Sequence, residues 1–295
     1  MIESITVLGA GTMGRGIAQL FAKRGFAVSL YDPNTEVLSA IEKNLHTSVV
    51  LFSELVEAVT PADLIIEAAP EQLEIKRQLY ARLASCIKND AIVASNTSTY
   101  SLESLAENQP FRDRMMITHF FNPAHLIPLV EIVGLPSTPS SVISEVMDLL
   151  RLCGRTPVLL NRDIPGFIAN RLQAALMREA CYLLDTGVAN ADQIDTVVKE
   201  GLGLRWAFKG PFEIADLGGL DIWSKVTGHL FPTLSISDEA PQSITAKVAD
   251  GELGVKRGQG FYRYEDAAAI AADMHDGIQK LVTLKKIMSS EDESL

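Results

Sequence analysis

In the first half of the chain, short apolar runs alternate with amphipathic stretches, a pattern typical of βαβ units on a parallel sheet. The apolar runs predict strands at Ile5–Leu8, Ala27–Tyr31, Leu64–Glu67, Ala91–Ala94, Met115–Thr118, Leu129–Val133 and Pro157–Leu160, with a short one near Val49–Leu51. The amphipathic stretches predict helices at Met13–Lys23, Thr35–Leu45, Glu74–Ala84 and Val142–Cys153. We therefore predict an α/β fold with a doubly wound sheet in the N-terminal half.

The pattern changes at the turn residues 161–166, after which we predict helices and no strands. The helices are expected at Phe167–Leu184, Ala191–Glu200, Glu213–Val226 and Ile244–Ala249. The sequence thus predicts two domains, the sheet domain over residues 1–161 and an all-helical C-terminal domain over residues 162–295.

Composition narrows the function classes. The 295 residues are 47% apolar and 21% charged, as expected for a globular protein, and the formal charge is −11. This acidity argues against a nucleic-acid partner or an anionic membrane surface. Cys86, Cys153 and Cys181 are odd in number and widely spaced, which predicts no disulfide framework and no metal site. With no targeting segment or membrane span evident, we expect a cytoplasmic protein.

A glycine-rich turn follows the first predicted strand and opens the first predicted helix. It contains Gly9, Ala10, Gly11, Thr12, Met13 and Gly14, with glycines at the spacing of the dinucleotide-binding fingerprint. The second strand ends at Asp32, where a carboxylate can accept hydrogen bonds from the adenosine ribose and repel a 2′-phosphate. We predict a Rossmann-type domain that binds NAD in preference to NADP.

A histidine and a glutamate supply candidate acid–base chemistry. His119 follows a predicted strand, at the edge where doubly wound sheets bind ligands. Glu131 lies within the apolar run Leu129–Val133, and burying its carboxylate is costly unless its charge is matched. We predict that Glu131 accepts the imidazole N–H, so that His119 can take a proton from a hydroxyl. Each residue alone has an ordinary structural interpretation, but together, beside a dinucleotide site, they favour proton transfer coupled to hydride transfer.

These residues belong to a set of motifs by which the chain resembles the L-3-hydroxyacyl-CoA dehydrogenase family, particularly the enzymes similar to 3-hydroxybutyryl-CoA dehydrogenase. The matching motifs, in order along nearly the whole chain, are Gly9–Gly14, Ile66–Glu71, Ala94–Ser98, His119–Pro123, Pro165–Arg171 and Gly258–Tyr262. The resemblance implies an NAD-dependent interconversion of 3-hydroxyacyl and 3-oxoacyl compounds in fatty acid metabolism. It also implies a homodimer formed through the C-terminal helices.

The resemblance assigns roles by position. His119 is implied as the general base, Glu131 as its partner, and Ser98 and Asn170 as groups that hold the substrate oxygens beside the nicotinamide. The positions implied to contact NAD are Glu71, Lys76, Ser98, Asn122 and Lys256. For the two lysines, residue type alone favours solvated surface positions.

Two departures from the family bear on the substrate. Only 34 residues separate Asp32 from Glu67, too few for the family's helical hairpin that holds the CoA nucleotide, and Lys43 is the only lysine among them. The stretch from Gly203 to Pro211 is similar to the gulonate dehydrogenase and lambda-crystallin branch, whose substrate is a free carboxylate. Arg205 is therefore a candidate carboxylate clamp, although a surface ion pair explains an arginine there equally well.

Three hypotheses follow from the sequence. The first is a dehydrogenase of 3-hydroxyacyl-CoA, and the second is a dehydrogenase of a small free hydroxy or carbonyl acid. The third is a nucleotide-binding structural protein without activity, because fold alone does not imply function. Dehydrogenases that use a catalytic lysine at the start of the second domain are disfavoured, because residues 166–171 include no lysine.

Overall fold

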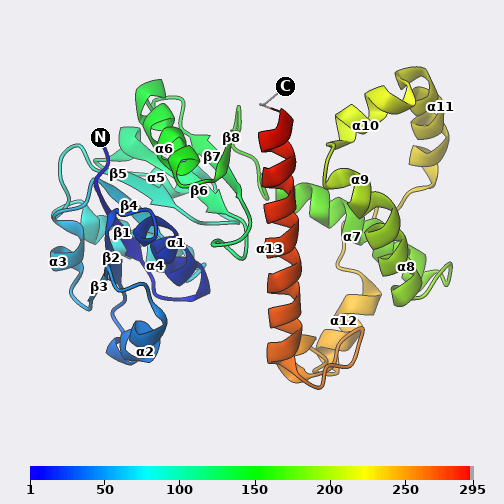
Figure 1. Cartoon of the computed structure of the whole chain (residues 1–295), viewed down its shortest axis with the longest axis horizontal. Coiled ribbons are helices and arrows are strands. Elements are labelled where there is room, and N and C mark those ends of the chain that lie inside the picture. The colour runs from blue at the N-terminus through cyan, green and yellow to red at the C-terminus, as the bar shows by residue number, and fades with distance from the viewer. Residues whose placement is uncertain (293–295) are drawn as a thin grey trace. The chain divides into compact units, whose positions relative to one another are not determined.

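The computed structural model describes residues 1–292, and the chain divides into two compact units, Met1–Ala169 and Asn170–Leu295 (Figure 1). The division falls later than the boundary expected after Asn161, because the residues that follow Asn161 still pack on the sheet. Asp163 accepts a hydrogen bond from the Leu102 N–H, and the Phe167 ring belongs to the apolar core of the first unit.

The first unit is built on an eight-stranded sheet in the order β3-β2-β1-β4-β5-β6-β7-β8. Its strands are β1 (Ser4–Leu8), β2 (Ala27–Tyr31), β3 (Val49–Phe52), β4 (Leu64–Glu67), β5 (Ile92–Ser95), β6 (Met115–Phe120), β7 (Leu129–Gly134) and β8 (Thr156–Leu159). Every predicted strand is present within a residue or two. All neighbours are parallel except β6 and β7, which run antiparallel, a reversal that the predicted alternation did not contain.

Helices cover both faces of this sheet, each over its own apolar core. One core contains residues of α1 (Thr12–Ala22), α2 (Thr35–Ile41) and α6 (Ser140–Leu152). The other contains residues of α3 (Leu55–Val59), α4 (Leu73–Leu83) and α5 (Leu102–Ala106). Successive strand residues alternate between the faces, as Val7 and Leu8 do, so most strand positions on both faces are apolar.

The topology and register bring several strand ends together at one edge. The chain order reverses between β1 and β4, which is the switch point where doubly wound sheets bind ligands. Leu8 pairs with both Tyr31 and Glu67, and Glu67 pairs with Ser95, so these four strands end level with one another. The residues that follow them therefore line one edge of the sheet.

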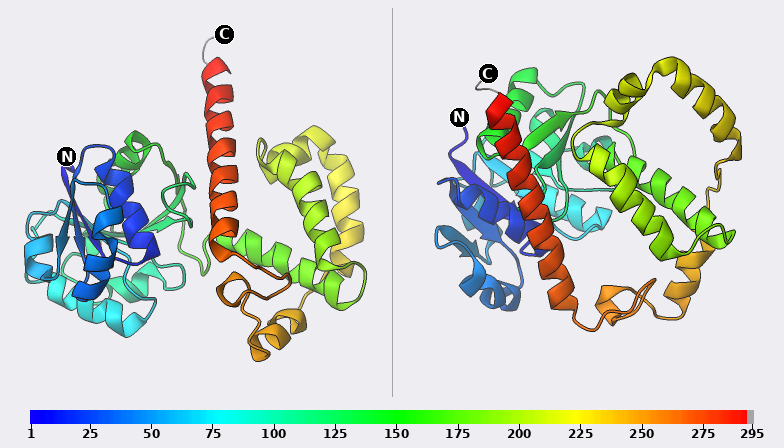
Figure 2. Two further views of the ribbon diagram at one scale, coloured as in Figure 1. Left: turned by 60° about the horizontal axis from the view of Figure 1, so that its bottom comes forward. Right: turned by 45° about the vertical axis from the view of Figure 1, so that its right-hand side comes forward.

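The second unit is helical, as predicted. It contains α7 (Ala169–Asp185), whose first residue belongs to the sheet unit, α8 (Ala191–Val197), α9 (Leu204–Trp206), α10 (Pro211–Gly218), α11 (Leu220–Leu230), α12 (Gln242–Ala249) and α13 (Ala267–Asp292) (Figure 2). The single helix predicted over Glu213–Val226 is wrong. Gly219 has a φ of +87°, a left-handed conformation that ends α10 and begins α11 in a new direction. Helix α13 was not predicted.

Within residues 1–292, none of the helices combines the length and the apolar character that crossing a bilayer requires.

Candidate active site

The turn after β1 forms a cradle that only small residues can build. Gly9 has a φ of +105°, and a Cβ there would lie 2.5 Å from the carbonyl oxygen of Ala68. A Cβ on Gly14 would lie 1.8 Å from the carbonyl oxygen of Gly9, so α1 can pack on the turn only without one. A Cβ on Gly11 would meet nothing within 4 Å, so the backbone at the start of α1 faces open space. Gly11 to Met13 thus fit a diphosphate at a helix N-terminus.

Asp32 is fixed at the end of β2 by two backbone donors. Its carboxylate accepts the N–H of Ala10 at 2.9 Å and the N–H of Asn34 at 2.9 Å. It lines a pocket of about 280 Å³ between the turn after β1 and α4, where Arg82 is also a lining residue. This pocket fits an adenosine, with Asp32 available to the ribose hydroxyls. Arg82 was missed because it is 50 residues from Asp32 along the chain, which left no local signal.

His119 and Glu131 face each other directly across the antiparallel pair β6 and β7. His119 Nδ1 is 2.9 Å from Glu131 Oε2, and both side chains are buried. The other carboxylate oxygen, Oε1, accepts the N–H of Ile168 at 2.9 Å and the N–H of Ala169, the first residue of α7, at 3.0 Å. The glutamate therefore has the charge partner that the sequence predicted and two helix-terminal donors that it did not indicate.

Phe167 is a positioning residue that the sequence did not single out. Its φ is +51°, a left-handed conformation that costs a non-glycine residue about 1–3 kcal/mol. In this conformation the ring is buried, with its centroid 5.0 Å from that of His119. Phe167 also comes directly before the two N–H groups that bind Glu131. The only sequence signal was its place in the motif 165–171, next to Gly166.

A second buried carboxylate, Glu67, lies at the end of β4. It accepts hydrogen bonds from the ammonium of Lys76, the hydroxyls of Tyr80 and Ser95, and the N–H of Ala69, at 2.6–2.8 Å. The side chain of Lys76 is only 1% exposed, so the surface position that its residue type favoured is wrong. The burial of Tyr80 raises the pKa of its hydroxyl well above the ordinary value, and the negative charge of Glu67 raises it further.

Lys76 connects this buried carboxylate to Glu71 at the sheet edge, with Nζ 3.1 Å from Glu71 Oε2. Glu71 Oε1 accepts the hydroxyl of Thr97 and the N–H groups of Ser98 and Thr99. Burial opposes ionisation of Glu71, but the hydrogen bond from Thr97 and the charge of Lys76 outweigh it and hold its pKa below the ordinary value. The network thereby fixes the backbone at Ser98, whose side chain is exposed.

The first unit therefore brings the predicted residues Gly9–Gly14, Asp32, Glu71, Lys76, Ser98, His119 and Glu131 to the carboxyl edge of its sheet. Asn122 is exposed in the connection between β6 and β7. Asn170, Arg205 and Lys256 belong to the second unit, where Asn170 is half-buried in α7 and the two cations are exposed. Their roles remain predictions.

A dinucleotide cradle and a buried histidine–glutamate pair on one doubly wound sheet define the protein as an oxidoreductase. Models of the 3-hydroxyacyl-CoA dehydrogenase NAD-binding domain match residues 4–54 and 43–164, and the C-terminal domain of that family matches residues 166–264. The chain belongs to the 3-hydroxyacyl-CoA dehydrogenase family, and it is an NAD-dependent dehydrogenase that acts on CH–OH groups.

Relatives within this family differ in substrate. The chain is 33% identical, over 99% of its length and 100% of the relative's, to 5-formyl-3-hydroxy-2-methylpyridine 4-carboxylate 5-dehydrogenase of Mesorhizobium japonicum. A crystal structure of an enzyme with that activity, described as an NAD⁺-dependent dismutase, has a TM-score of 0.91 at 32% identity, covering 98% of this chain and 99% of that one. The (S)-3-hydroxybutyryl-CoA dehydrogenase of Ralstonia eutropha has a TM-score of 0.70 at 29% identity, covering 90% and 100%.

The Asp32 pocket yields a prediction about cofactor choice. Wild-type protein should bind NADH much more tightly than NADPH, because Asp32 repels a 2′-phosphate. Asp32→Ala should narrow that difference, since Arg82 then meets the phosphate without a competing carboxylate. Adding Arg82→Gln to Asp32→Ala should remove the gain in NADPH affinity. Fluorescence titrations of both cofactors measure these constants, and equal affinities in the wild type would contradict the assignment.

Proposed function

We propose that the protein transfers hydride between NAD and a small free carboxylic acid bearing a hydroxyl or carbonyl group. His119 is the general base in the oxidative direction and the general acid in the reverse. The observation that carries the free-acid assignment is the short, acidic segment between β2 and β4, which lacks the means to hold a CoA nucleotide.

His119 is built to move one proton. Its Nδ1 is engaged by Glu131, which fixes the tautomer and leaves Nε2 for the substrate hydroxyl. Bound NAD would supply the acceptor for the hydride of the carbinol carbon, and Nε2 of His119 would take the hydroxyl proton as the C–O bond becomes a carbonyl. The imidazolium so formed is stabilised by the buried carboxylate of Glu131.

Ser98 and Asn170 are assigned to hold the substrate oxygen. The N–H of Ser98 is bound by Glu71, so the exposed hydroxyl has a fixed backbone at the edge where β5 ends. Asn170 offers an amide two residues after Ile168, whose N–H is bound by Glu131. Glu71 and Asn122 are assigned to the cofactor, together with Lys256, while Lys76 acts through Glu71 rather than by direct contact.

The segment between β2 and β4 argues against a CoA thioester. It consists of α2, a turn of 3₁₀ helix at Glu42–Asn44, β3 and α3, with no helical hairpin. Residues 33–66 contain five acids, Glu36, Glu42, Glu54, Glu57 and Asp63, against the single cation Lys43. A phosphorylated nucleotide needs donors and positive charge close to it, and this segment presents the opposite charge.

The similarity to known proteins also favours a free acid over a CoA thioester. The structure that matches with a TM-score of 0.91 over nearly the whole chain is an enzyme named for a pyridine carboxylate. The 3-hydroxybutyryl-CoA dehydrogenase matches with a TM-score of 0.70. Arg205 on α9 is exposed and offers a planar, bidentate donor for a carboxylate. The second candidate function, interconversion of 3-hydroxyacyl-CoA and 3-oxoacyl-CoA, is favoured by the family motifs that the chain retains.

A homodimer formed through the second unit completes the proposal. Among the described residues of that unit only Cys181 is buried, and helices α8 to α12 contain no buried side chain. Large apolar side chains are instead exposed on α10 and α11, including Phe212 (87%) and Leu217 (78%). An apolar surface of this extent is typical of an interface. The reducing cytoplasm is the expected compartment, in keeping with three free cysteines.

We expect His119→Gln to lower kcat by about 10²–10⁴-fold, because it removes the proton acceptor. NADH affinity should stay close to wild type, since His119 is not part of the dinucleotide cradle. Glu131→Gln should also lower kcat by removing the charge that stabilises the imidazolium. Stopped-flow measurement of NADH formation, with the half-buried His46→Gln as a control, tests this. Full turnover in His119→Gln would place the base elsewhere.

A substrate panel separates the two candidate functions. Acetoacetyl-CoA, a truncated thioester with the same acyl group, and several 3-hydroxy acids are assayed with wild type and Arg205→Ala. For a free-acid enzyme, Arg205→Ala should raise the KM of the acids strongly, by about tenfold or more, because a charged hydrogen bond is lost. The two thioesters should then react similarly to one another and respond little to the substitution. A large preference for the full CoA ester, insensitive to Arg205, would favour the second candidate.

The dimer is tested by sedimentation of the full-length protein. Wild type should sediment as a dimer, and the double variant Phe212→Asp/Leu217→Asp should sediment as a monomer, since a buried, unpaired carboxylate opposes association. Leu152→Asp on α6, an exposed leucine of the first unit, is the control and should remain a dimer. A monomeric wild type would contradict the proposal.

A further inference from the structure

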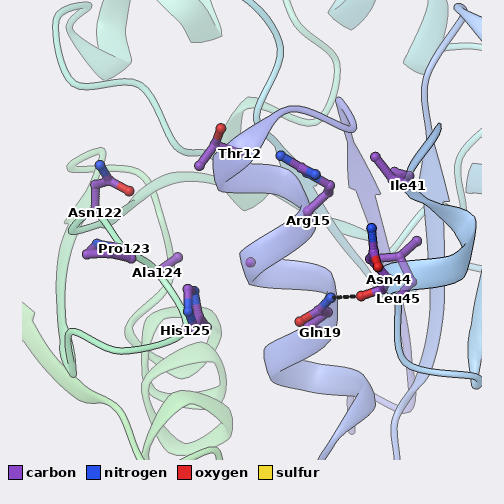
Figure 3. Close-up of a pocket in the computed structure, with 11 residues that line it drawn as sticks. Thr12, Arg15, Gln19, Ile41, Asn44, Leu45, Asn122, Pro123, Ala124 and His125 are labelled. Atoms are coloured by element: carbon purple, nitrogen blue, oxygen red, sulfur yellow. Dashed lines mark hydrogen bonds between the residues drawn. The ribbon is translucent and has the colours of Figure 1, made fainter. Parts of the chain in front are cut away.

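A pocket of about 210 Å³ lies beside the dinucleotide turn, entirely within the first unit (Figure 3). Three walls enclose it. The first wall is one side of α1, with Thr12, Arg15 and Gln19. The second wall is the end of α2 and the turn after it, with Ile41, Asn44 and Leu45, and the third wall is residues 122–125. Residues 122–125 come shortly after β6, the strand that carries His119, and Asn122 is three residues from His119 along the chain.

Arg15 gives this pocket an uncompensated positive charge. The residues that line the pocket include no Asp, Glu or Lys and no other Arg, although the chain as a whole has a formal charge of −11. The Nε of Arg15 is buried and has no hydrogen-bond partner among the described residues, which also form no salt bridge with its guanidinium. Because that Nε is closed to solvent, an anion in the pocket would meet the rest of the guanidinium, whose charge no described ion pair offsets.

The remaining lining groups suit an anion. Asn44 and Asn122 contribute amides from opposite walls. Gln19 donates from Nε2 to the carbonyl oxygen of Asn44 at 2.9 Å, which ties the α2 segment to α1 (Figure 3).

Helix α1 lies close to the third wall at Gly16. A Cβ on Gly16 would lie 3.4 Å from Ala124 Cβ and 3.7 Å from His125 Nδ1, so the helix surface and residues 124–125 are already within ordinary contact distance there. The walls are thus held together, and the free volume remains on the Arg15 side of the helix.

We propose that this pocket is an anion subsite of the catalytic centre, in which Arg15 binds a carboxylate or phosphate group of the substrate. The inference rests on the proposed function for the reacting end of the substrate and adds what holds its charged end. In a free acid the anion is the substrate's own carboxylate, and in a thioester it is a phosphate of the CoA. Arg15 is thus an alternative to Arg205 as the residue that holds the single carboxylate of a free acid.

The first experiment tests anion binding without turnover. Protein saturated with NADH, so that the dinucleotide site is filled, is titrated with inorganic phosphate by calorimetry at constant ionic strength. Wild type and Lys23→Gln, which removes one positive charge just beyond the other end of α1, should bind phosphate equally. Arg15→Gln should weaken binding by about tenfold or more, as expected for loss of a charge-assisted hydrogen bond. Absence of binding to wild type, or equal binding to Arg15→Gln, would overturn the proposal.

The second experiment identifies the source of the anion. Acetoacetate, its uncharged analogue acetoacetamide, and acetoacetyl-CoA are compared as substrates of the same three proteins, with NADH affinity measured alongside. A tenfold rise in KM for acetoacetate alone in Arg15→Gln supports the subsite and the free-acid function. A rise confined to acetoacetyl-CoA supports the subsite and overturns the free-acid function. Equal effects on acetoacetate and acetoacetamide, or a tenfold loss of NADH affinity, overturn the subsite.

Discussion

The pairing of β6 with β7 is the constraint on which the active site depends. Only an antiparallel neighbour brings residue 131 opposite residue 119 in so short a length of chain, because a parallel partner needs a crossover of a dozen or more residues. Once opposed, the two side chains satisfy each other inside the sheet. Removing one partner of such a buried pair costs about 3–5 kcal/mol, because the other charge is left unmatched.

Glu131 also binds the backbone at the start of α7. Its second oxygen binds the N–H groups of Ile168 and Ala169, donors that a helix start leaves unsatisfied. The strained Phe167 aims those donors at the carboxylate and places its own ring against His119. One buried carboxylate thus holds both the His119 imidazole and the start of α7. Glu67 has the same role at β4, where Lys76 transmits its position to the loop that carries Ser98.

Local patterns were enough to predict the strands, the glycine turn, Asp32 and the histidine–glutamate pair. Each of these has a signal within a few residues: an apolar run, a glycine spacing, or a carboxylate inside an aliphatic stretch. Lys76 could not be placed, because its burial depends on Glu67 and Glu71 reaching it from outside its helix. The break at Gly219 was missed because a single glycine inside a helical pattern is often tolerated, and only its positive φ shows that the chain turns. Arg82 and Arg15 became candidates only when distant segments were brought around them.

Charge is distributed unevenly around α1. Residues 33–66, where the chain departs from the family's CoA-binding hairpin, contain five acids and one lysine. The pocket beside α1 is lined by an arginine and by no carboxylate. A long, multiply phosphorylated ligand would have to cross the acidic segment, whereas a compact anion needs only the arginine. Because electrostatic cost grows with the number of charges brought near the acids, this arrangement discriminates by ligand size and charge together. Because a free acid and a thioester would use the same histidine–glutamate pair, we assign the choice between them to the groups around α1.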